Sequence, residues 1–414
     1  MIRFSIGLIL AGALTIGCSD SEPPPTGQSL VIIVESALYD SLATSLDQYA
    51  QTMRLEEFEI YVEPWEPATV QALRRRLFDY IDAYHIDGAL LVGDFPAAWY
   101  EMAGFRPYEA FPTDIYLQDR DAEWVDQDGN DIYDFHTDDL HLDIYTARLQ
   151  GTPAELQDYF GRVHHYRHVG PLVNESAFIF IDDKWSGTNT EDGLGLNELY
   201  DDIEVIKDKA ESTLDNYLAR LTGDGAEFVY QKNHGGEDYL SFAHVDEDGK
   251  PAGATLTSSQ IVERNLKVSF VNMTNCFAAQ FLAEASVAEA YTVGTDYGLA
   301  IIGLTKEGVI DKPRVFHQNL SRGMSWGQAY RAWFNEVGKQ KQYEVSSLGV
   351  VIMGDPLLTL GGHPLAPGTA QERVAAAGED SAYVVQDGQP DCGLETEPVG
   401  FEEYRNAHPE FVED

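Results

Sequence analysis

The sequence predicts an α/β protein with a mainly parallel sheet. Short apolar runs rich in Val, Ile and Phe, bounded by turn residues, indicate buried strands. Segments with a helical period fill most of the intervals between them, and this alternation is typical of β-α-β units, whose strands run parallel. The Gly170-Pro171 pair is a strong turn signal that interrupts the pattern. We therefore expect two tandem units, residues 29–170 and 171–361.

The first unit opens with the run SLVIIVE. Its expected strands are 29–35, 57–63, 88–94 and 140–149, and its first two expected helices are 38–53 and 67–85. A third helix begins after Thr152, which is a typical N-cap residue, with Pro153 at the first helical position. Glu155 is placed to reach back to the cap, so we expect this helix to run to about His168.

The second unit shows the same alternation. Its expected strands are 177–183, 227–233, 267–275, 297–305 and 348–356, and its expected helices are 195–221, 257–263 and about 313–337. We find no internal repeat and no second segment apolar enough to suggest a membrane span.

The N-terminus predicts export. Residues 1–17 combine a positive start with an apolar run too short to span a bilayer, which is the pattern of a signal peptide. The sequence LTIGC at 14–18 is similar to a bacterial lipobox, which makes Cys18 the expected lipidation site of an outer-membrane or cell-surface lipoprotein. Thr15 departs from the usual Leu, so ordinary cleavage to a periplasmic or secreted protein stays open. Residues 18–28 are Pro-rich and polar, and we expect a tether.

The charge is strongly negative. The chain has a net charge of −42, with 69 acidic and 27 basic residues among 414. Such a surface repels nucleic acid and anionic membranes, so we expect neither as a partner, and membrane contact only through the lipid anchor. It suits a cationic substrate, bound calcium or a salty medium. Residues 362–414 form an acidic tail that we expect to be weakly ordered.

Two expected strands end in residues that carry chemistry. The run EFVYQKN leads to His234-Gly235, and KVSFVNMTN leads to Cys276. Because the carboxyl ends of parallel strands share one edge of a sheet, we expect His234 and Cys276 to be neighbours. A thiolate is a nucleophile that an imidazole can activate or assist. Gly235 has no Cβ, so its backbone N–H can approach a substrate and join that of Cys276 in an oxyanion hole.

Two structural alternatives exist for Cys276. It is either a small buried hydrophobic residue, the common environment of cysteine, or one half of a disulfide with Cys392.

At these residues the chain resembles the gingipain family of cysteine peptidases, within the clan of caspases, legumains and clostripain. The clan pattern places apolar strands before His-Gly and before the nucleophilic Cys. The resemblance covers roughly residues 29–361 and includes, in order, LLVGDFP, DRDAEWVDQDGNDIYD, DIYTARLQGTPAELQDYFGRVHHY, FVYQKNHGG, VSFVNMTNC, RGMSWGQAYRAWF and VVIMGDPLLTL. It implies a caspase-like three-layer αβα sandwich, with 171–361 as the catalytic subdomain.

The resemblance also implies roles. Cys276 would attack the scissile carbonyl, and His234 would protonate the leaving amine. The backbone N–H groups of Gly235 and Cys276 would hold the oxyanion. An acid that orients the His is expected at the end of the preceding strand, which makes Asp183 or Asp182 the candidate. No organic cofactor is implied.

The resemblance also bears on specificity. The family favours basic P1 residues, and Glu191 and Asp192 lie where a specificity acid is expected. Asn275 departs from the small residue that often precedes the family's Cys, and it would narrow the pocket or add a donor.

The acidic run DRDAEWVDQDGNDIYD suits a calcium ion, because oxygen ligands alternate around a glycine. The spacing differs from that of an EF-hand, and a solvated acidic loop is the alternative. The candidate ligands are Asp119, Asp121, Asp126, Asp128, Asn130 and Asp134.

A nearby group of histidines, His164, His165 and His168, lacks the Glu of a HExxH zinc motif, and we interpret it as a helix surface.

We therefore predict a cysteine-type endopeptidase, a hydrolase that acts on protein or peptide substrates through a Cys276 acyl-thioester. The alternative is a non-catalytic, calcium-binding surface lipoprotein that binds peptides or matrix. A peptide ligase is a third reading, because an amine can take up the same thioester. The sequence does not determine the oligomeric state.

Overall fold

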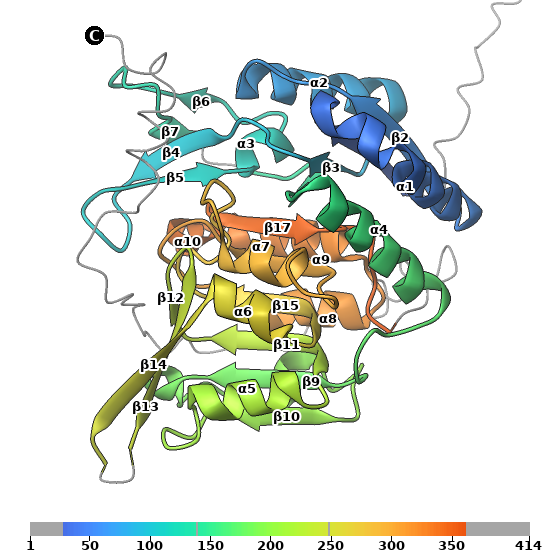
Figure 1. The fold of residues 1–414 in the computed structure, drawn as a ribbon. Helices are drawn as coiled ribbons and strands as arrows, with labels where there is room; N and C mark the ends of the chain where they lie inside the picture. The colour runs from blue at the N-terminus through green and yellow to red at the C-terminus, as the bar shows by residue number, and fades with distance from the viewer. Residues whose placement is uncertain (1–27, 138–139, 247–248, 362–414) are drawn as a thin grey trace, which may run out of the picture.

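The computed structural model describes residues 28–137, 140–246 and 249–361. Within them, one ten-stranded sheet forms the centre of the molecule (Figure 1). In spatial order its strands are β10 (Ile203–Ile206), β9 (Ala177–Ile181), β11 (Ala226–Lys232), β15 (Val268–Thr274), β16 (Ala300–Leu304), β17 (Val350–Gly354), β8 (Tyr145–Leu149), β3 (Gly88–Val92), β1 (Ser29–Val34) and β2 (Glu59–Pro64). Among the described residues, no helix combines the length and apolar character needed to cross a bilayer.

The strand direction reverses once across this sheet. The five strands from β10 to β16 run parallel to one another. β17 pairs antiparallel with β16 and parallel with β8, and β8, β3, β1 and β2 continue in that second direction. The carboxyl ends of the first-half strands therefore lie at one edge of the sheet, and those of β9, β11 and β15 lie at the opposite edge.

Helices cover both faces of the sheet in the first half. The helices are α1 (Ser36–Leu55), α2 (Val70–Tyr84) and α4 (Pro153–His168). β1 is buried at all six positions, and its side chains alternate between two cores. Leu30, Ile32 and Val34 pack with α1 and α4, whereas Val31 and Ile33 pack with α2.

The second half has the same layered arrangement. Its helices are α5 (Leu214–Thr222), α6 (Ser258–Arg264), α7 (Val287–Thr292), α8 (Pro313–Ser321) and α9 (Trp326–Trp333). Phe178 and Phe180 of β9 share a core with α5, α6 and α7, whereas Ile179 of the same strand faces the core of α8 and α9. The predicted three-layer αβα sandwich with a mainly parallel sheet is confirmed.

The predicted start of α4 is also confirmed. The Thr152 side chain accepts a hydrogen bond from the backbone of Glu155, and the Glu155 carboxylate accepts one from the N–H of Thr152 in return. Pro153 occupies the first turn.

The prediction of one helix over residues 195–221 is wrong. The short 3₁₀ turn η2 (Gly193–Gly195) precedes β10, and only α5 is helical in the rest of that range. The apolar spacing from Leu196 to Ile206 fits a helix, but Ile203, Val205 and Ile206 are β-branched. Pairing with β9 therefore decides the conformation of this segment.

The prediction of one helix over 313–337 is also wrong, because the chain breaks after α8. Gly323 adopts a φ of 85°, which ends that helix. Ser325 caps α9 in a capping box with Gln328. The π-helical turn η3 (Phe334–Gly338) and the short α10 (Glu344–Ser347) follow.

Three small sheets and two short helices surround the core. They are the hairpin β4 (Ala98–Met102) and β5 (Glu109–Thr113), the pair β6 (Trp124–Val125) and β7 (Phe135–His136), and the sheet of β12 (His234–Gly235), β13 (Tyr239–Val245) and β14 (Pro251–Thr257). α3 (Ile115–Gln118) and the 3₁₀ turn η1 (Asp183–Trp185) complete the set. The sequence predicted none of these elements, several of which position the candidate sites.

Candidate active site

β11 and β15 bring the predicted catalytic residues to one edge of the sheet. The strands are parallel neighbours, with Lys232 opposite Thr274. His234 and Cys276 each follow the last of these paired residues by two positions, beyond the end of the ladder, and His234 pairs with Ser241 of β13. Two residues that are distant in sequence therefore share the carboxyl edge of adjacent parallel strands.

Gly235 lies directly against the chain that carries Cys276. A Cβ at Gly235 would stand 3.2 Å from the Cβ of Asn275 and 3.3 Å from the carbonyl oxygen of Cys276. A side chain there would require these neighbours to shift by a few tenths of an ångström. Glycine at this position therefore allows the backbones of residues 235 and 276 to approach each other.

Asn275 fastens the two strand ends together. Its Nδ2 donates to the carbonyl oxygen of Asn233 at 2.6 Å and to the Oδ1 of Asn233 at 2.7 Å. Its Oδ1 accepts from Nε2 of Gln231 at 2.8 Å, and all three side chains are buried. From the sequence, Asn275 is expected to narrow the substrate pocket or to add a hydrogen-bond donor to it. In the structure, the Asn275 side chain links the two strand ends, which we call the amide clamp, and its Nδ2 donates to Asn233 within the protein.

Cys276 precedes a sharp bend of the chain. Phe277 has a φ of 59°, in the left-handed region that non-glycine residues rarely adopt. The Phe277 N–H donates to the carbonyl oxygen of Lys306 at 3.0 Å, which holds the bend. Cys276 is buried, and its Sγ lies 3.9 Å from the carbonyl oxygen of Gly308.

Cys276 is disulfide-bonded in this structure. The chain's other two cysteines, Cys18 and Cys392, both lie outside the described residues. The sequence leaves a disulfide open as an alternative to a reactive thiol at this residue. A sulfur in a disulfide is not a nucleophile, so chemistry at Cys276 requires prior reduction of this bond.

His234 stands beside an aromatic side chain that the sequence did not single out. The ring centroids of His234 and Trp185 are 4.8 Å apart, with the planes inclined by 48°. Trp185 ends η1, directly after β9, and the Nζ of Lys232 lies 5.6 Å from its ring centroid. The one signal in the sequence was an aromatic residue shortly after a buried strand, near other residues of the site.

Two acids precede this tryptophan, and their positions differ. Asp182 is fully buried, and its carboxylate accepts the N–H of Lys184 at 3.2 Å. Burial raises the pKa of Asp182 to about 7, although the backbone N–H groups of Lys184, Ala243 and His234 act to lower it. Asp183 is half-buried and opens η1. Of the two candidates, Asp182 is the fully buried one, and the His234 backbone N–H is among the groups that lower its pKa.

A second pair of charged groups lies close to this edge. Burial lowers the pKa of Lys232, whereas Asp311 and Asp182 act to raise it. Burial raises the pKa of Asp311 to about 6, and Lys232 acts to lower it. The site therefore contains a partly buried cation beside the acids, and neither Lys232 nor Asp311 was predicted from the sequence.

The two specificity candidates have different environments. Asp192 forms an ion pair with Arg314 of α8. Glu191 is exposed, and its backbone N–H donates to Oδ1 of Asn189 at 3.0 Å. Asp192 is thus engaged with a cation of the protein itself.

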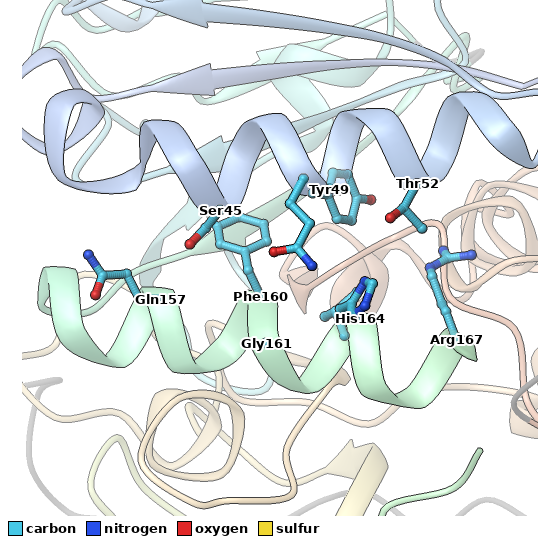
Figure 2. Close-up of a pocket in the computed structure, with 10 residues that line it drawn as sticks. Ser45, Tyr49, Thr52, Gln157, Phe160, Gly161, His164 and Arg167 are labelled. Atoms are coloured by element: carbon cyan, nitrogen blue, oxygen red, sulfur yellow. The ribbon is translucent and has the colours of Figure 1, made fainter. Parts of the chain in front are cut away.

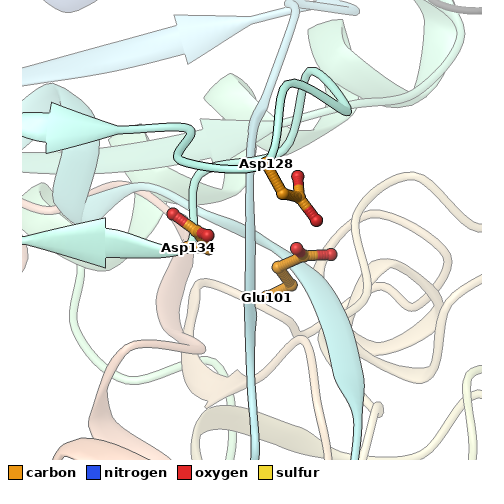
Figure 3. A group of neighbouring side chains, drawn as sticks. All are labelled: Glu101, Asp128 and Asp134. Carbon is orange, nitrogen blue, oxygen red and sulfur yellow. The ribbon is translucent and has the colours of Figure 1, made fainter.

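The acidic run contributes to one group of three carboxylates. Oxygens of Glu101, Asp128 and Asp134 all lie within 4.8 Å of one another (Figure 3). Glu101 comes from β4 and was not predicted, because it precedes the acidic run. Its Oε1 accepts from the Asn130 amide at 3.1 Å, and its Oε2 accepts from the Tyr108 hydroxyl at 2.7 Å.

The other predicted ligands lie elsewhere. The carboxylate of Asp119 is buried and accepts the N–H groups of Asp121, Ala122 and His141. Asp126 accepts three backbone N–H groups of its own loop. These two side chains shape the loop, and Asp121 is exposed to solvent.

The histidine group lies on α4. His164 lines a small cavity of about 90 Å³ between α1 and α4, with Tyr49 and Arg167 (Figure 2). The rings of His164 and His168 are 4.4 Å apart. Burial lowers the pKa of His164, and His168 and His165 lower it further.

Several predictions concern residues that the structure does not describe. The signal peptide at 1–17, the lipidation site Cys18, nearly all of the tether and the acidic tail at 362–414 lie outside the described residues.

No protein-family model matches the chain, and no curated protein matches its sequence. Among solved structures, the chain is similar to the Arg-specific cysteine proteinase gingipain R, with a TM-score of 0.58 and 16% identity. The alignment covers 81% of this chain and 78% of gingipain R. A transcriptional activator of the comK gene from Bacillus halodurans aligns with a TM-score of 0.18 and 10% identity, too low to indicate a shared fold. The chain thus has the caspase-like fold seen in gingipain R.

Proposed function

We propose that the protein is a cysteine-type endopeptidase with Cys276 as nucleophile and His234 as its partner. The observation that carries the proposal is the parallel pairing of β11 with β15, since His234 and Cys276 each follow the end of one of these strands by two residues. The fold shared with a cysteine proteinase supports the same reading. Membership of the gingipain family is part of this proposal, since 16% identity speaks only to the fold.

The proposed reaction begins once Cys276 is reduced. The thiolate attacks the scissile carbonyl carbon, and the backbone N–H groups of Gly235 and Cys276 stabilise the oxyanion. The C–N bond breaks as His234 transfers a proton to the leaving amine. Water then hydrolyses the thioester, which releases the acid and restores the thiol. We propose Asp182, rather than Asp183, as the acid that positions His234, because Asp182 is fully buried and the His234 backbone N–H acts to lower its pKa.

A preference for basic P1 residues is part of the proposal. Gingipain R is an Arg-specific enzyme, and this chain carries a large negative charge. Since Asp192 is paired with Arg314, Glu191 is the better candidate for contact with a basic P1 side chain. Lys232 near His234 works against that preference, so the P1 profile is a sensitive test.

The deciding experiment is cleavage of a pooled fluorogenic peptide library by the full chain and by Cys276→Ala, each with and without a thiol reductant. We expect turnover only in the reduced wild type, with Arg or Lys enriched at P1. Turnover that persists in Cys276→Ala would rule out the proposed nucleophile. Peptide mapping without reduction would identify the disulfide partner of Cys276.

A calcium-binding surface protein without catalysis is the second candidate, and the disulfide at Cys276 favours it. In that case the bond is structural, and the reduced thiol would react with iodoacetamide slowly and independently of His234. Fast alkylation of reduced Cys276 that slows in His234→Ala supports the enzyme, because the imidazole then promotes the thiolate.

We also propose that Glu101, Asp128 and Asp134 hold a structural Ca²⁺. Three carboxylates whose oxygens converge form a hard donor set that suits this ion. Glu101 lies on β4, whose hairpin partner β5 carries Glu109, and Glu109 lies 2.5 Å from Nζ of Lys306. The ion would therefore support the segment that receives the Phe277 N–H.

We propose export and lipid anchoring at Cys18 on sequence grounds alone. Intact mass of the protein purified from detergent extracts would show an added diacylglyceryl group on the mature N-terminus. A mass that matches cleavage elsewhere would reject the anchor.

A further inference from the structure

A cavity of about 730 Å³ lies at the sheet edge opposite to His234 and Cys276. It is formed by the segments that follow β1, β2, β3 and β8, together with residues 281–284 and Glu289 of α7. Because the strand direction reverses between β16 and β17, these carboxyl ends face away from the candidate active site. The cavity lining includes neither His234 nor Cys276, and its residues 281–284 follow Cys276 in the chain.

The topology places this cavity at a crevice where α/β sheets commonly bind ligands. β1 lies between β2 and β3, so the chain leaves it in one direction and later returns on its other side. α1 and α2 consequently cover opposite faces, and the loops after β1 and β3 diverge. Glu35 follows β1 and Asp94 follows β3, so both stand where this divergence opens a crevice.

The polar lining consists mainly of hydrogen-bond acceptors. Five carboxylates line the cavity, and among its described lining residues there is no Lys, Arg or His. They are Glu35, Asp94, Glu155, Glu284 and Glu289. The side-chain Oε1 of Gln150, another lining residue, is buried without a hydrogen-bond partner, while its Nε2 donates to Asp94 at 2.8 Å. A buried acceptor without a donor indicates a ligand that supplies one.

Three of the carboxylates have local structural roles, and one of them is Asp94, which accepts the hydrogen bond from Gln150. Glu35 accepts the N–H of Asp94 at 3.1 Å, and Glu155 completes the capping box of α4. Glu284 is exposed at the rim. Burial raises the pKa of Glu289 to about 7, and the nearby charges of Glu155 and Asp94 raise it further. The cavity thus concentrates negative charge that no described cation offsets.

The apolar part of the lining includes Phe95 and Phe281. The guanidinium of Arg148 lies 3.8 Å from the centroid of the Phe281 ring, but it is buried and bonded to Asp114. Its charge is therefore already paired within the core. The cavity combines aromatic surface with carboxylates, which suits a cation on an apolar stem.

The arrangement does not match a compact metal site. Among the described residues, the one group of three acidic or metal-binding side chains with oxygens within 4.8 Å of one another is Glu101, Asp128 and Asp134. The cavity carboxylates are spread over a larger volume. They fit several separated positive charges better than a single ion.

We propose that this cavity binds an extended organic cation, with ammonium or guanidinium groups on an aliphatic stem, supplied by a polyamine or by a basic peptide segment. The carboxylates and the Gln150 oxygen accept its N–H groups, and the stem lies against Phe95 and Phe281. The inference does not depend on catalysis at Cys276.

The test is isothermal titration calorimetry on the full-length chain with spermidine and, in a parallel arm, with acetylated and amidated trilysine. We expect saturable binding that weakens as salt is added. The double variant Asp94→Asn with Glu289→Gln should weaken binding by about tenfold or more, because two charged acceptors become neutral. The matched control, Asp158→Asn with Glu336→Gln, removes the same charge from exposed positions and should change the Kd by less than about twofold.

Binding of spermidine alone identifies a polyamine site, and binding of trilysine alone identifies a basic peptide site. Absence of saturable binding in both arms overturns the proposal, as does equal weakening in the control variant. A Ca²⁺ titration whose heat disappears in the cavity variant also overturns it, in favour of a metal site.

Thermal unfolding checks that the variants fold, and the single rim variant Glu284→Gln gives a second, less invasive test. Peptide cleavage is not read in any arm, so this proposal and the peptidase proposal can fail separately.

Discussion

The two carboxyl edges of the sheet are built from opposite chemistry. Near His234 and Cys276, neutral side-chain amides hold the strand ends together. Asn275 uses both the Nδ2 and the Oδ1 of its amide for this purpose. At the opposite edge, Glu289 and four other carboxylates surround a cavity without a basic residue among its described lining. The first edge holds two segments at fixed positions, and the second concentrates charge. One sheet therefore provides a site suited to covalent chemistry and another suited to electrostatic binding.

The difference has a topological origin. Ligand sites form at carboxyl ends because loops diverge there. A sheet with one strand direction would place all its loops at one edge. The antiparallel pairing of β17 with β16 creates a second carboxyl edge at the opposite ends of the strands. If the two edges are independent, changes at one should leave the function of the other intact.

The largest expected effect is at the catalytic edge. His234→Ala should reduce kcat/KM on the best library substrate by about 10²–10⁴-fold, because the leaving amine loses its proton donor. Steady-state kinetics of the reduced protein measure this loss. Spermidine binding at the opposite edge should be unchanged. His164→Ala is the matched control, since His164 lies between α1 and α4, and a comparable loss in that variant would contradict the assigned role of His234.

A smaller effect is expected at the amide clamp. Asn275→Ala should lower the free energy of unfolding by about 2–3 kcal/mol, because it leaves the buried Gln231 donor and Asn233 acceptors without partners. Chemical denaturation measures the difference. Asn197→Ala, at an exposed position, should change it by less than about 0.5 kcal/mol. A neutral result for Asn275→Ala would mean that the strand ends are held by other contacts.

Calcium bound by Glu101, Asp128 and Asp134 should stabilise the folded protein. At free Ca²⁺ near 100 times its Kd, mass action adds about 2.7 kcal/mol to the unfolding free energy. Thermal unfolding with Ca²⁺ and with EDTA measures the shift, and activity of the reduced protein should fall in EDTA. Asp128→Asn with Asp134→Asn should abolish the calcium dependence. A calcium effect that persists in this variant would place the ion elsewhere.

The smallest expected effect is pH-dependent and belongs to the acidic edge. The pKa of Glu289 is raised from its ordinary value of 4.5 to about 7, so the folded state loses stability as pH rises through that interval. Glu289→Gln should therefore stabilise the protein at pH 8 by about 1–2 kcal/mol, allowing for solvent screening, and have no such effect at pH 4. Urea unfolding at the two pH values provides the measurement. Equal effects at both would show that the gain is not electrostatic.

The local sequence determined the fold class and the position of the candidate dyad. Continuous apolar runs predicted β1, β9, β11 and β15, because buried parallel strands are apolar on both faces. The Thr152 capping box predicted the start of α4 for a reason that lies within four residues. His234 and Cys276 could be predicted as neighbours because each follows such a strand. Parallel strands place their carboxyl ends at one edge of the sheet, where ligands bind.

Tertiary structure decided the rest, since it depends on contacts between residues far apart in the chain. Periodicity favoured a helix over 195–221, but pairing with β9 made β10 a strand. The antiparallel placement of β17 has no local signature, so the second edge and its cavity could not be predicted. Glu101 joins Asp128 and Asp134 only through folding of β4. The sequence by itself determines local conformation and burial. Strand direction, the gathering of carboxylates around the cavity and the convergence of the proposed calcium ligands arise only when distant segments meet.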